Sequence, residues 1–223
     1  MPTDSTRLQR ILRLLERAYP EAQTELRHRN CFELLIATIL SAQCTDERVN
    51  RVTPVLFDRY PTPERLAGAG PKQVEELIRS TGFFRAKTRS IIGCSQEIVK
   101  RFGGAVPRTL EELVTLPGVW RKTANVILGN CYQIPSIVVD THVKRVSRRL
   151  GLAKKEDPDG IEAELAAILP KTSWTKVSHR LLLHGRYLCK ARYPLCEQCP
   201  LLEVCEAPEK DRVLKARAQK GRR

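Results

Sequence analysis

Apolar side chains recur every three to four positions along most of the chain, which is the pattern of helices with one buried face. The clearest example lies near the start, where the apolar positions are Leu8, Ile11, Leu12 and Leu15. The stretch "NCFELLIATILSAQ" is instead apolar on every side after Asn30, its predicted N-cap, and Glu33. A helix without a polar face predicts a central, buried element.

Caps and breakers divide this pattern into short helices. "TPERLAG" and "GPKQVEELIRSTG" each place proline at the first helical position and glycine near the end. Asp46 and Asp140 are predicted N-caps, and Pro54 predicts a kink in the helix after Asp46. The best strand candidate, "PSIVVD", is short. The sequence therefore predicts an all-α protein of about ten short helices.

The chain carries a strongly basic charge. Its 223 residues have a formal net charge of +14, and the excess recurs in "RSTGFFRAKTRS", "VKRVSRRL" and "VLKARAQKGRR". This charge predicts a polyanionic partner, above all nucleic acid, although a merely soluble cationic surface is the alternative. No apolar run reaches the roughly 20 residues that span a bilayer. The N-terminus lacks the apolar region of a secretory signal, so we expect a cytoplasmic protein, nucleoid-associated if the source is bacterial. We also expect a monomer.

The eight cysteines fall into two sets. The scattered set is expected to consist of small core residues, namely Cys31, Cys44, Cys94 and Cys131. The second set has the spacing C-x6-C-x2-C-x5-C, at Cys189, Cys196, Cys199 and Cys205. Four thiolates this close suit either Zn²⁺ or a [4Fe–4S] cluster. The single C-x-x-C pair and the wide first interval favour the iron–sulfur cluster, with zinc as the alternative.

The segment "RTLEELVTLPGVWRKTANVILGN" predicts a helix, a tight turn and a second helix. Its first helix starts with a predicted capping box and ends at Pro117 and Gly118, and the second begins near Trp120 or Arg121. The first amides of that second helix lack helical partners, so phosphate is a natural acceptor for them. Arg121 and Lys122 add charge, which predicts sequence-neutral binding of the DNA backbone. A plain structural hairpin is the alternative.

This segment resembles the helix-hairpin-helix motif of a DNA glycosylase superfamily. Three further stretches are similar to the endonuclease III family, namely "LLIATILSAQCTD", "IPSIVVDTHVKRVSRRLGL" and "LLLHGRYLCKARYPLCEQCPLLEVC". The resemblance implies a [4Fe–4S] cluster on the four clustered cysteines and a DNA cleft between two helical domains. The expected parts are a cluster domain at 1–25 and 134–206, a six-helix barrel with the hairpin at 26–133, and a flexible basic tail at 207–223.

The resemblance also implies a catalytic pair. Lys122 would attack the sugar C1′ as a neutral amine, expel the base and form a Schiff base that permits β-elimination. Burial, or cations such as Arg121 and Lys144, must favour the neutral amine. Asp140 would stabilise the developing oxocarbenium charge. Without the resemblance, Lys122 is more simply a phosphate contact. His142 is assigned either a local hydrogen bond or a phosphate contact.

A glycosylase must also take its target nucleotide out of the stack. By resemblance, Gln43 enters the duplex beside the orphaned base and Phe83 acts as an apolar wedge, while Ser41 and Asp46 line the same cleft. The alternatives are a helix C-cap contact for Gln43 and core packing for Phe83. The cluster is expected to hold the basic loop "KARYPLC", which contains Lys190, Arg192 and Tyr193, against phosphate.

The resemblance to the endonuclease III family implies a bifunctional glycosylase and abasic-site lyase that acts on oxidised pyrimidines in double-stranded DNA. The alternatives are a non-catalytic DNA-binding iron–sulfur paralogue and, less favoured, an adenine mismatch glycosylase, because that branch typically lacks the hairpin lysine and carries an added C-terminal domain. Trp120 departs from the family, whose hairpin usually reads Gly-Val-Gly. A positive φ there would cause strain, whereas a negative φ would leave the amide able to meet phosphate. The hypothesis is that Trp120 weakens phosphate docking or restricts the substrate range, and a tolerated surface change is the simpler interpretation.

Overall fold

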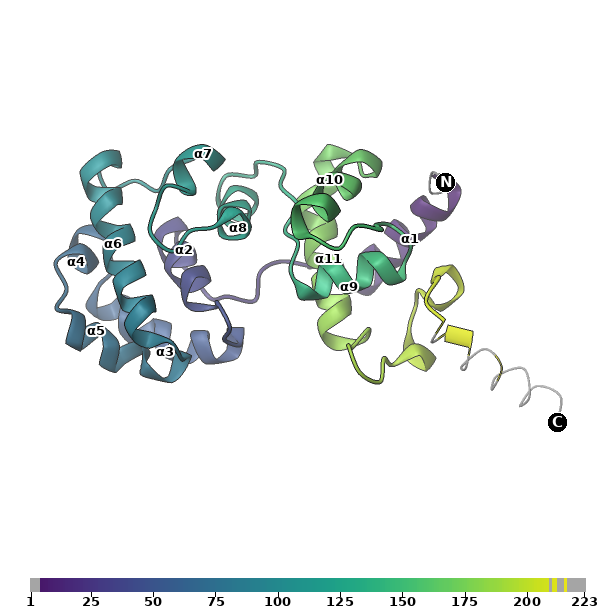
Figure 1. Ribbon diagram of the computed structural model, residues 1–223, viewed down its shortest axis with the longest axis horizontal. Helices are drawn as coiled ribbons and strands as arrows, with labels where there is room; N and C mark the ends of the chain where they lie inside the picture. The colour runs from purple at the N-terminus through teal and green to yellow at the C-terminus, as the bar shows by residue number, and fades with distance from the viewer. Residues whose placement is uncertain (1–4, 209, 212–214, 216–223) are drawn as a thin grey trace. The chain divides into compact units, whose positions relative to one another are not determined.

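The computed structural model describes residues 5–208, 210–211 and 215. Helices are the only regular secondary structure in this part of the chain, which confirms the predicted all-α class (Figure 1). Within it, no helix has the length and apolar character needed to cross a membrane. Most of the basic tail predicted at 207–223 lies outside the described residues.

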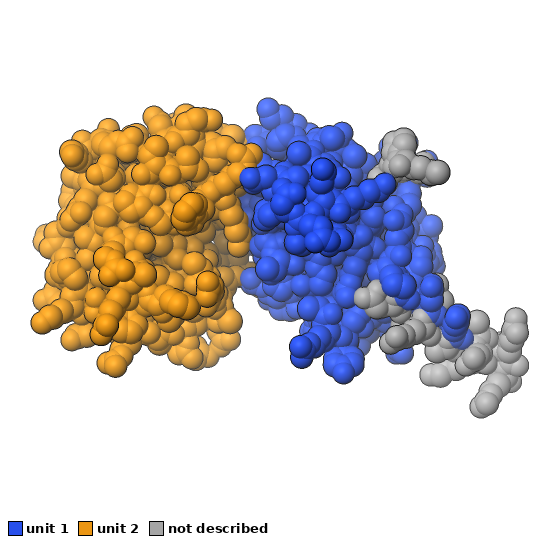
Figure 2. All heavy atoms as spheres, in the orientation of Figure 1, with its two compact units in different colours: residues 1–23, 135–223 blue, residues 24–134 orange. Residues whose placement is uncertain are grey.

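The chain forms two compact units, which are described separately. Unit 1 contains residues 1–23 and 135–223, and unit 2 contains residues 24–134 (Figure 2). Unit 1 is therefore built from both ends of the chain, and unit 2 from a single continuous segment between them.

Unit 2 is a bundle of α-helices with one short 3-10 helix, η1. In chain order these elements are α2 Cys31–Leu40, α3 Asp46–Arg59, α4 Pro63–Ala67, α5 Pro71–Ile78, η1 Arg79–Thr81, α6 Phe84–Phe102, α7 Leu110–Leu113 and α8 Arg121–Cys131. Helix α2 packs against α3, α6 and α8, and every residue after its first is buried. The absence of a polar face thus does predict the central helix. Its N-cap is Asn30, whose side chain accepts from the Glu33 amide at 2.9 Å, as expected.

Unit 1 packs around α9 and α11. Its elements are α1 Ser5–Ala18, α9 Thr141–Arg149, α10 Pro158–Ile168, η2 Lys171–Ser173, α11 Trp174–Tyr187, η3 Cys196–Gln198 and η4 Leu202–Val204. The core joins distant parts of the sequence through buried side chains such as Ile11, Leu15, Val143, Val146 and Leu181. Because α1 contacts α11 and η4, the N-terminal helix completes the unit that contains the clustered cysteines.

Two local predictions were wrong, namely the cap of α3 and the strand in "PSIVVD". The N-cap of α3 is Thr45, whose hydroxyl accepts from the Arg48 amide, and Asp46 is the first helical residue. Pro54 lies inside α3, which is assigned as one continuous helix, and the kink expected there stays a prediction. "PSIVVD" lies in a segment, 133–140, that forms no strand. Its amides bond to side chains of α11 instead: Ser136 N to Thr175 Oγ1 at 3.3 Å and Val138 N to Ser178 Oγ at 3.2 Å.

The scattered cysteines are not all core residues. Only Cys94, in the middle of α6, is fully buried. Cys31 begins α2, Cys131 ends α8 and Cys44 lies in the loop before α3, and all three are half-buried. Helix ends and loops leave part of a side chain in contact with solvent, which the apolar neighbours in the sequence do not reveal.

Candidate DNA-binding and catalytic surfaces

The hairpin between α7 and α8 is fixed by a buried turn. Leu116 and Val119 are 2% and 4% exposed, and the Val119 amide donates to the Leu116 carbonyl at 3.1 Å. Gly118 between them has φ +77°, and a Cβ there would lie 2.7 Å from Cβ of Ser90 and 3.3 Å from Cγ2 of Ile39. Glycine is therefore required both by the backbone conformation and by the close packing against α2 and α6.

Trp120 is the N-cap of α8, which confirms the predicted start of the second hairpin helix. Its φ of −103° and ψ of 169° are ordinary extended values, so the tryptophan causes no backbone strain. The indole is 80% exposed and gives the helix no side-chain cap, since it can only donate a hydrogen bond. The first turn of α8 thus presents its positive end together with an exposed aromatic ring.

Lys122 lies in that first turn, and its side chain is exposed, as is that of Arg121. Burial was one of the two expected ways to favour a neutral amine, and unit 2 does not itself supply it. The other expected cation, Lys144, belongs to unit 1, where its Nζ donates to the Glu156 carbonyl at 2.5 Å.

Two loops of unit 2 hold exposed residues in left-handed conformations. Gln43 follows α2 with φ +52° and is exposed, and its side chain makes no hydrogen bond within the described residues. Phe83 precedes α6 with φ +46° and is 67% exposed. Each such residue costs on the order of 1 kcal/mol, so the surrounding structure must impose the conformation.

The simpler interpretations of these two residues were wrong. Phe83 is not a core residue, because two thirds of its side chain meets solvent. Gln43 does not cap α2, whose C-cap is Ser41. The Ser41 hydroxyl donates back to the Thr38 carbonyl at 2.8 Å, and Asp46 is half-buried at the start of α3. Gln43 and Phe83 are therefore the two protruding side chains of these loops.

Asp140 caps α9, as the sequence predicts. Its Oδ1 accepts from the backbone amides of His142 and Val143, both at 2.8 Å. These two bonds fix the carboxylate at the positive end of the helix, and Oδ2 has no hydrogen-bond partner within the described residues. The half-buried side chain thus keeps one oxygen available while the other is held rigidly.

A chain of hydrogen bonds leads from this cap to the cysteine cluster. Nη2 of Arg145 lies 3.1 Å from Nδ1 of His142 and donates to the Gly185 carbonyl at 2.8 Å. Nε of the same guanidinium donates to the Cys189 carbonyl at 2.9 Å. Burial lowers the pKa of Arg145, although the nearby Cys189 thiol opposes this effect. Helix α9 is therefore fastened to the loop that begins at Cys189.

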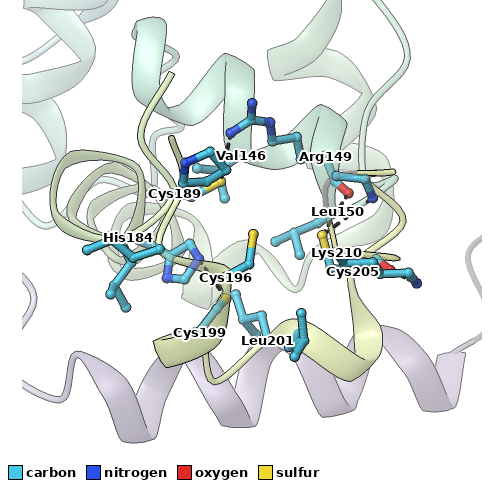
Figure 3. A pocket seen from close by; sticks show the side chains of 15 residues that line it. Val146, Arg149, Leu150, His184, Cys189, Cys196, Cys199, Leu201, Cys205 and Lys210 are labelled. Atoms are coloured by element: carbon cyan, nitrogen blue, oxygen red, sulfur yellow. Dashed lines mark hydrogen bonds between the residues drawn. The ribbon is translucent and has the colours of Figure 1, made fainter. Parts of the chain in front are cut away.

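The four clustered cysteines line one cavity of unit 1 (Figure 3). They reach it from the end of α11, from η3 and from the residue after η4. The remaining wall is mainly apolar and includes Leu150, Leu188, Leu195, Leu201 and Leu202. Among the described residues, no three histidine, cysteine, aspartate or glutamate side chains are placed to hold a single metal ion. The cysteines thus surround a shared, largely apolar space.

Several groups around this cavity interact with sulfur. The Ala207 amide donates to the Cys205 Sγ at 3.4 Å, and the Cys199 Sγ lies 3.6 Å from Nε2 of His184. Burial raises the pKa of the Cys199 thiol to about 11, and nearby cysteines add to that rise. Thiols in this setting become thiolates when a metal centre binds them, so the donor set has the chemistry of a metal–sulfur site.

Comparison with known proteins decides the family. Residues 36–171 match the HhH-GPD superfamily of base excision DNA repair proteins. The chain is 49% identical over 210 residues to the endonuclease III of Synechocystis sp., an alignment that covers 94% of the chain and 96% of that protein. It is 46% identical over 193 residues to the endonuclease III of Bacillus subtilis, covering 86% of the chain and 88% of that protein. The chain belongs to the endonuclease III family.

The fold is also that of solved endonuclease III structures. A trapped covalent intermediate of endonuclease III with DNA, in an estranged-adenine complex, matches with a TM-score of 0.89 and 42% identity over 95% of the chain and 99% of that structure. A non-covalent endonuclease III–DNA complex matches equally well, with a TM-score of 0.89. A thermostable thymine-DNA glycosylase, 19% identical, shares the fold with a TM-score of 0.82.

In this endonuclease III family member, the predicted site residues are divided between the units. Unit 2 contains Gln43, Phe83 and the hairpin with Gly118, Trp120 and Lys122, whereas unit 1 contains Asp140, His142 and Lys144. The predicted phosphate-binding loop of unit 1 follows α11, and its Lys190, Arg192 and Tyr193 are all exposed. Tyr193 is 89% exposed and left-handed, with φ +55°.

One unusual residue beside the predicted wedge was missed by the sequence interpretation. Lys87 lies in the first turn of α6 and is only 6% exposed. Burial lowers the pKa of its ammonium group, and the nearby Cys44 thiol opposes that effect. The signal was present in the sequence, because Lys87 falls four residues before Ile91 and in register with Ile98 on the buried face of α6.

Proposed function

We propose that this chain removes oxidised pyrimidines from double-stranded DNA and then cleaves the resulting abasic site through Lys122. Base excision by a DNA glycosylase with lyase activity is the function of the family to which the chain belongs. The observation that carries the proposal is the position of Lys122, exposed in the first turn of the hairpin helix directly after the tight turn at Gly118, where the first amides of the helix can donate hydrogen bonds to phosphate.

Lys122 acts as the nucleophile. Its neutral amine forms a bond to the sugar C1′ while the bond between C1′ and the base breaks, and the base leaves with the electron pair. The sugar ring of the C1′ adduct then opens as the C1′–O4′ bond breaks and O4′ takes a proton, which leaves a Schiff base between Lys122 and C1′. The Schiff base acidifies the C2′ proton, and loss of that proton expels the 3′ phosphate by β-elimination. Because Lys122 is exposed in unit 2, bound DNA must supply the burial that favours its neutral form.

Asp140 stabilises the positive charge that develops on the sugar as the base departs. Its Oδ1 is held by two amides, so Oδ2 is the oxygen directed to chemistry. A carboxylate with a fixed orientation does not need to reorganise when the charge appears, and this preorganisation is the main source of electrostatic catalysis. The same residue thus serves as both helix cap and catalytic group.

Gln43 and Phe83 open the duplex. The amide of Gln43 offers a donor and an acceptor to the base left without a partner, and the ring of Phe83 fills the stack as a wedge. Their exposure and their imposed left-handed backbone support this role. The hairpin residues Gly118, Trp120 and Arg121, together with Lys190 and Arg192, contact the backbone, with His142 and Lys144 near the start of α9.

Unit 1 is the cluster domain and unit 2 the hairpin-bearing barrel. The cavity lined by Cys189, Cys196, Cys199 and Cys205 would hold a [4Fe–4S] cluster, and its four sulfurs and apolar wall fit such a group. When bound, such a cluster would link the segments around η3, η4 and the end of α11 through its bonds to the four cysteine sulfurs. The chain's own residues then present Lys190 and Arg192 on the exposed loop between the first two cysteines.

Borohydride trapping on a duplex with one abasic site tests the proposal. The wild type is expected to form a covalent adduct, and Lys122→Ala is expected to form none while binding the duplex within about three-fold of the wild type. Arg121→Ala is the matched control, because it removes an adjacent exposed cation but keeps the amine. DNA binding without any adduct in the wild type would instead identify a non-catalytic DNA-binding paralogue.

A further inference from the structure

The ammonium group of Lys87 makes one hydrogen bond within the described residues. Its Nζ donates to the Thr81 carbonyl at 2.8 Å. A lysine has three N–H donors, and a buried ammonium with a single acceptor is costly compared with an apolar side chain of similar length. The apolar residues that follow on the same face of α6, Ile91 and Ile98, show what this position would hold if it served packing alone.

The hydrogen bond from the Lys87 side chain is made to the loop that carries Phe83. Thr81 ends η1, and Gly82 follows with φ +71° and ψ 159°, a conformation that only glycine adopts readily. Phe83 comes next with φ +46°. The Lys87 amide also donates to the Phe83 carbonyl at 3.0 Å, which is the first helical bond of α6. Through these two bonds, Lys87 contacts the carbonyl before Gly82 and the carbonyl of Phe83, so it brackets the two consecutive positive-φ residues.

Lys87 is also near the second protruding loop. The thiol of Cys44 is close enough to affect the ammonium group electrostatically, and Cys44 directly follows Gln43. The Cys44 amide donates to the Ser41 carbonyl at 3.1 Å, which closes the turn that projects Gln43. Helix α6 packs against α2, and η1 packs against α3, so the two loops lie near the first turn of α6, where Lys87 is the first buried residue.

We propose that Lys87 is a positioning residue that fixes the loop of Phe83 beside the loop of Gln43, so that both side chains enter the duplex together. This rests on the proposed function, because it assigns Lys87 to the base-extrusion step of the same reaction. Lys87 does not contact DNA or the reacting sugar in this proposal. It acts through the Thr81 carbonyl, by keeping the strained backbone at Gly82 and Phe83 in its observed conformation.

The test compares two substrates in single-turnover experiments on the full chain. Lys87→Met keeps the length of the side chain but removes the donor. Its excision of an oxidised pyrimidine from a duplex is expected to fall roughly 10- to 100-fold, since a displacement of about 1 Å can cost that much. Borohydride trapping on a single-stranded abasic oligonucleotide is expected to change less than about three-fold, because no base has to leave a stack.

Fluorescence reports the extrusion step directly. With 2-aminopurine placed opposite the lesion, the wild type is expected to raise the emission as the orphaned base unstacks, and Lys87→Met is expected to lose most of that rise. Lys100→Met, at an exposed lysine on the same helix, is the matched control and should leave both readouts unchanged. Equal losses on the single-stranded and duplex substrates, or no loss on either, would overturn the proposal.

A second variant covers the case in which Lys87→Met does not fold. Gly82→Ala introduces a Cβ that meets no atom within 4 Å, so it disturbs only the positive-φ backbone of the same loop. The same selective loss on the duplex is expected, and full duplex activity with Gly82→Ala would contradict the proposal. A wild type that fails to form an adduct even on the single-stranded substrate would instead defeat the proposed function of Lys122.

Discussion

Nη1 of Arg149 donates a hydrogen bond to the Sγ of Cys189 at 3.4 Å. The same guanidinium reaches the carbonyls of Lys190 at 2.9 Å and Ala191 at 3.5 Å. One side chain of α9 thus contacts a proposed cluster ligand and the first two residues of the exposed loop that follows it. A charged donor at a thiolate sulfur stabilises the negative charge and restricts the ligand.

Removal of this donor should weaken the proposed metal–sulfur site. We expect Arg149→Met to release iron to a chelator several-fold faster than the wild type, measured by the loss of visible absorbance and by bound iron. Arg148→Met is the matched control, because Arg148 is the next residue on α9 and pairs with Glu156 at 2.9 Å instead. Equal release rates in the two variants would show that the Arg149–Cys189 bond has no such role.

The two roles of Asp140 can be separated by substitution. Asparagine keeps the Oδ1 acceptor for the amides of His142 and Val143, so Asp140→Asn should change the free energy of unfolding by less than about 0.5 kcal/mol. Its single-turnover excision rate should fall by about two orders of magnitude, because the negative charge is lost. Asp140→Ala should reduce the excision rate by a similar factor and should also lower the free energy of unfolding by about 1 kcal/mol. Normal excision by Asp140→Asn would leave Asp140 as a cap only.

Substitution of Trp120 tests whether an exposed side chain at the hairpin changes DNA affinity or turnover without changing the backbone. Its φ of −103° means that Trp120→Gly relieves no strain, and glycine is an adequate N-cap, so stability should change by less than about 0.5 kcal/mol. The indole is 80% exposed at the start of the hairpin helix. We expect its removal to tighten binding of a lesion duplex, or to raise turnover, by about three-fold. Fluorescence anisotropy and steady-state rates measure this, and unchanged values would make Trp120 a tolerated surface change.

Local chemistry explains which features could be predicted from the sequence. The all-apolar pattern of α2, the Asp140 cap and the start of α8 at Trp120 each depend on residues within a few positions of one another. The α3 boundary was wrong by one residue because Thr45 and Asp46 are both good caps, and only the geometry of the turn chooses between them. The strand expected in "PSIVVD" failed because its amide partners, Thr175 and Ser178, are about 40 residues away.

Features that depend on tertiary packing could not be predicted in the same way. The periodicity of α6 places Lys87 on its buried face, but a lysine in isolation indicates an exposed position, and its acceptor, the Thr81 carbonyl, is supplied only by the fold. The family resemblance pointed to Gln43 and Phe83, but the positive φ of both residues and the surrounding contacts came only from the structure. The shared cavity of the four cysteines likewise depends on packing between α9, α11 and the C-terminal 3-10 helices.

The stability of unit 1 should depend on pH through His179. Burial, with a smaller contribution from Lys176, lowers the pKa of this histidine from 6.5 to about 4. Because the unfolded chain binds the proton more tightly, the contribution of His179 is complete above about pH 6.5 and is lost as the pH falls toward 4.

When the pH is lowered from 7.5 to 5.5, this single group should lower the free energy of unfolding of the wild type by about 1 kcal/mol. His179→Gln cannot bind the proton, so its stability should fall by about that much less over the same interval, whatever its stability at pH 7.5. Urea unfolding at the two pH values, followed by circular dichroism, measures the difference. If the free energy of unfolding fell equally in the wild type and the variant, folding would not lower the pKa of His179.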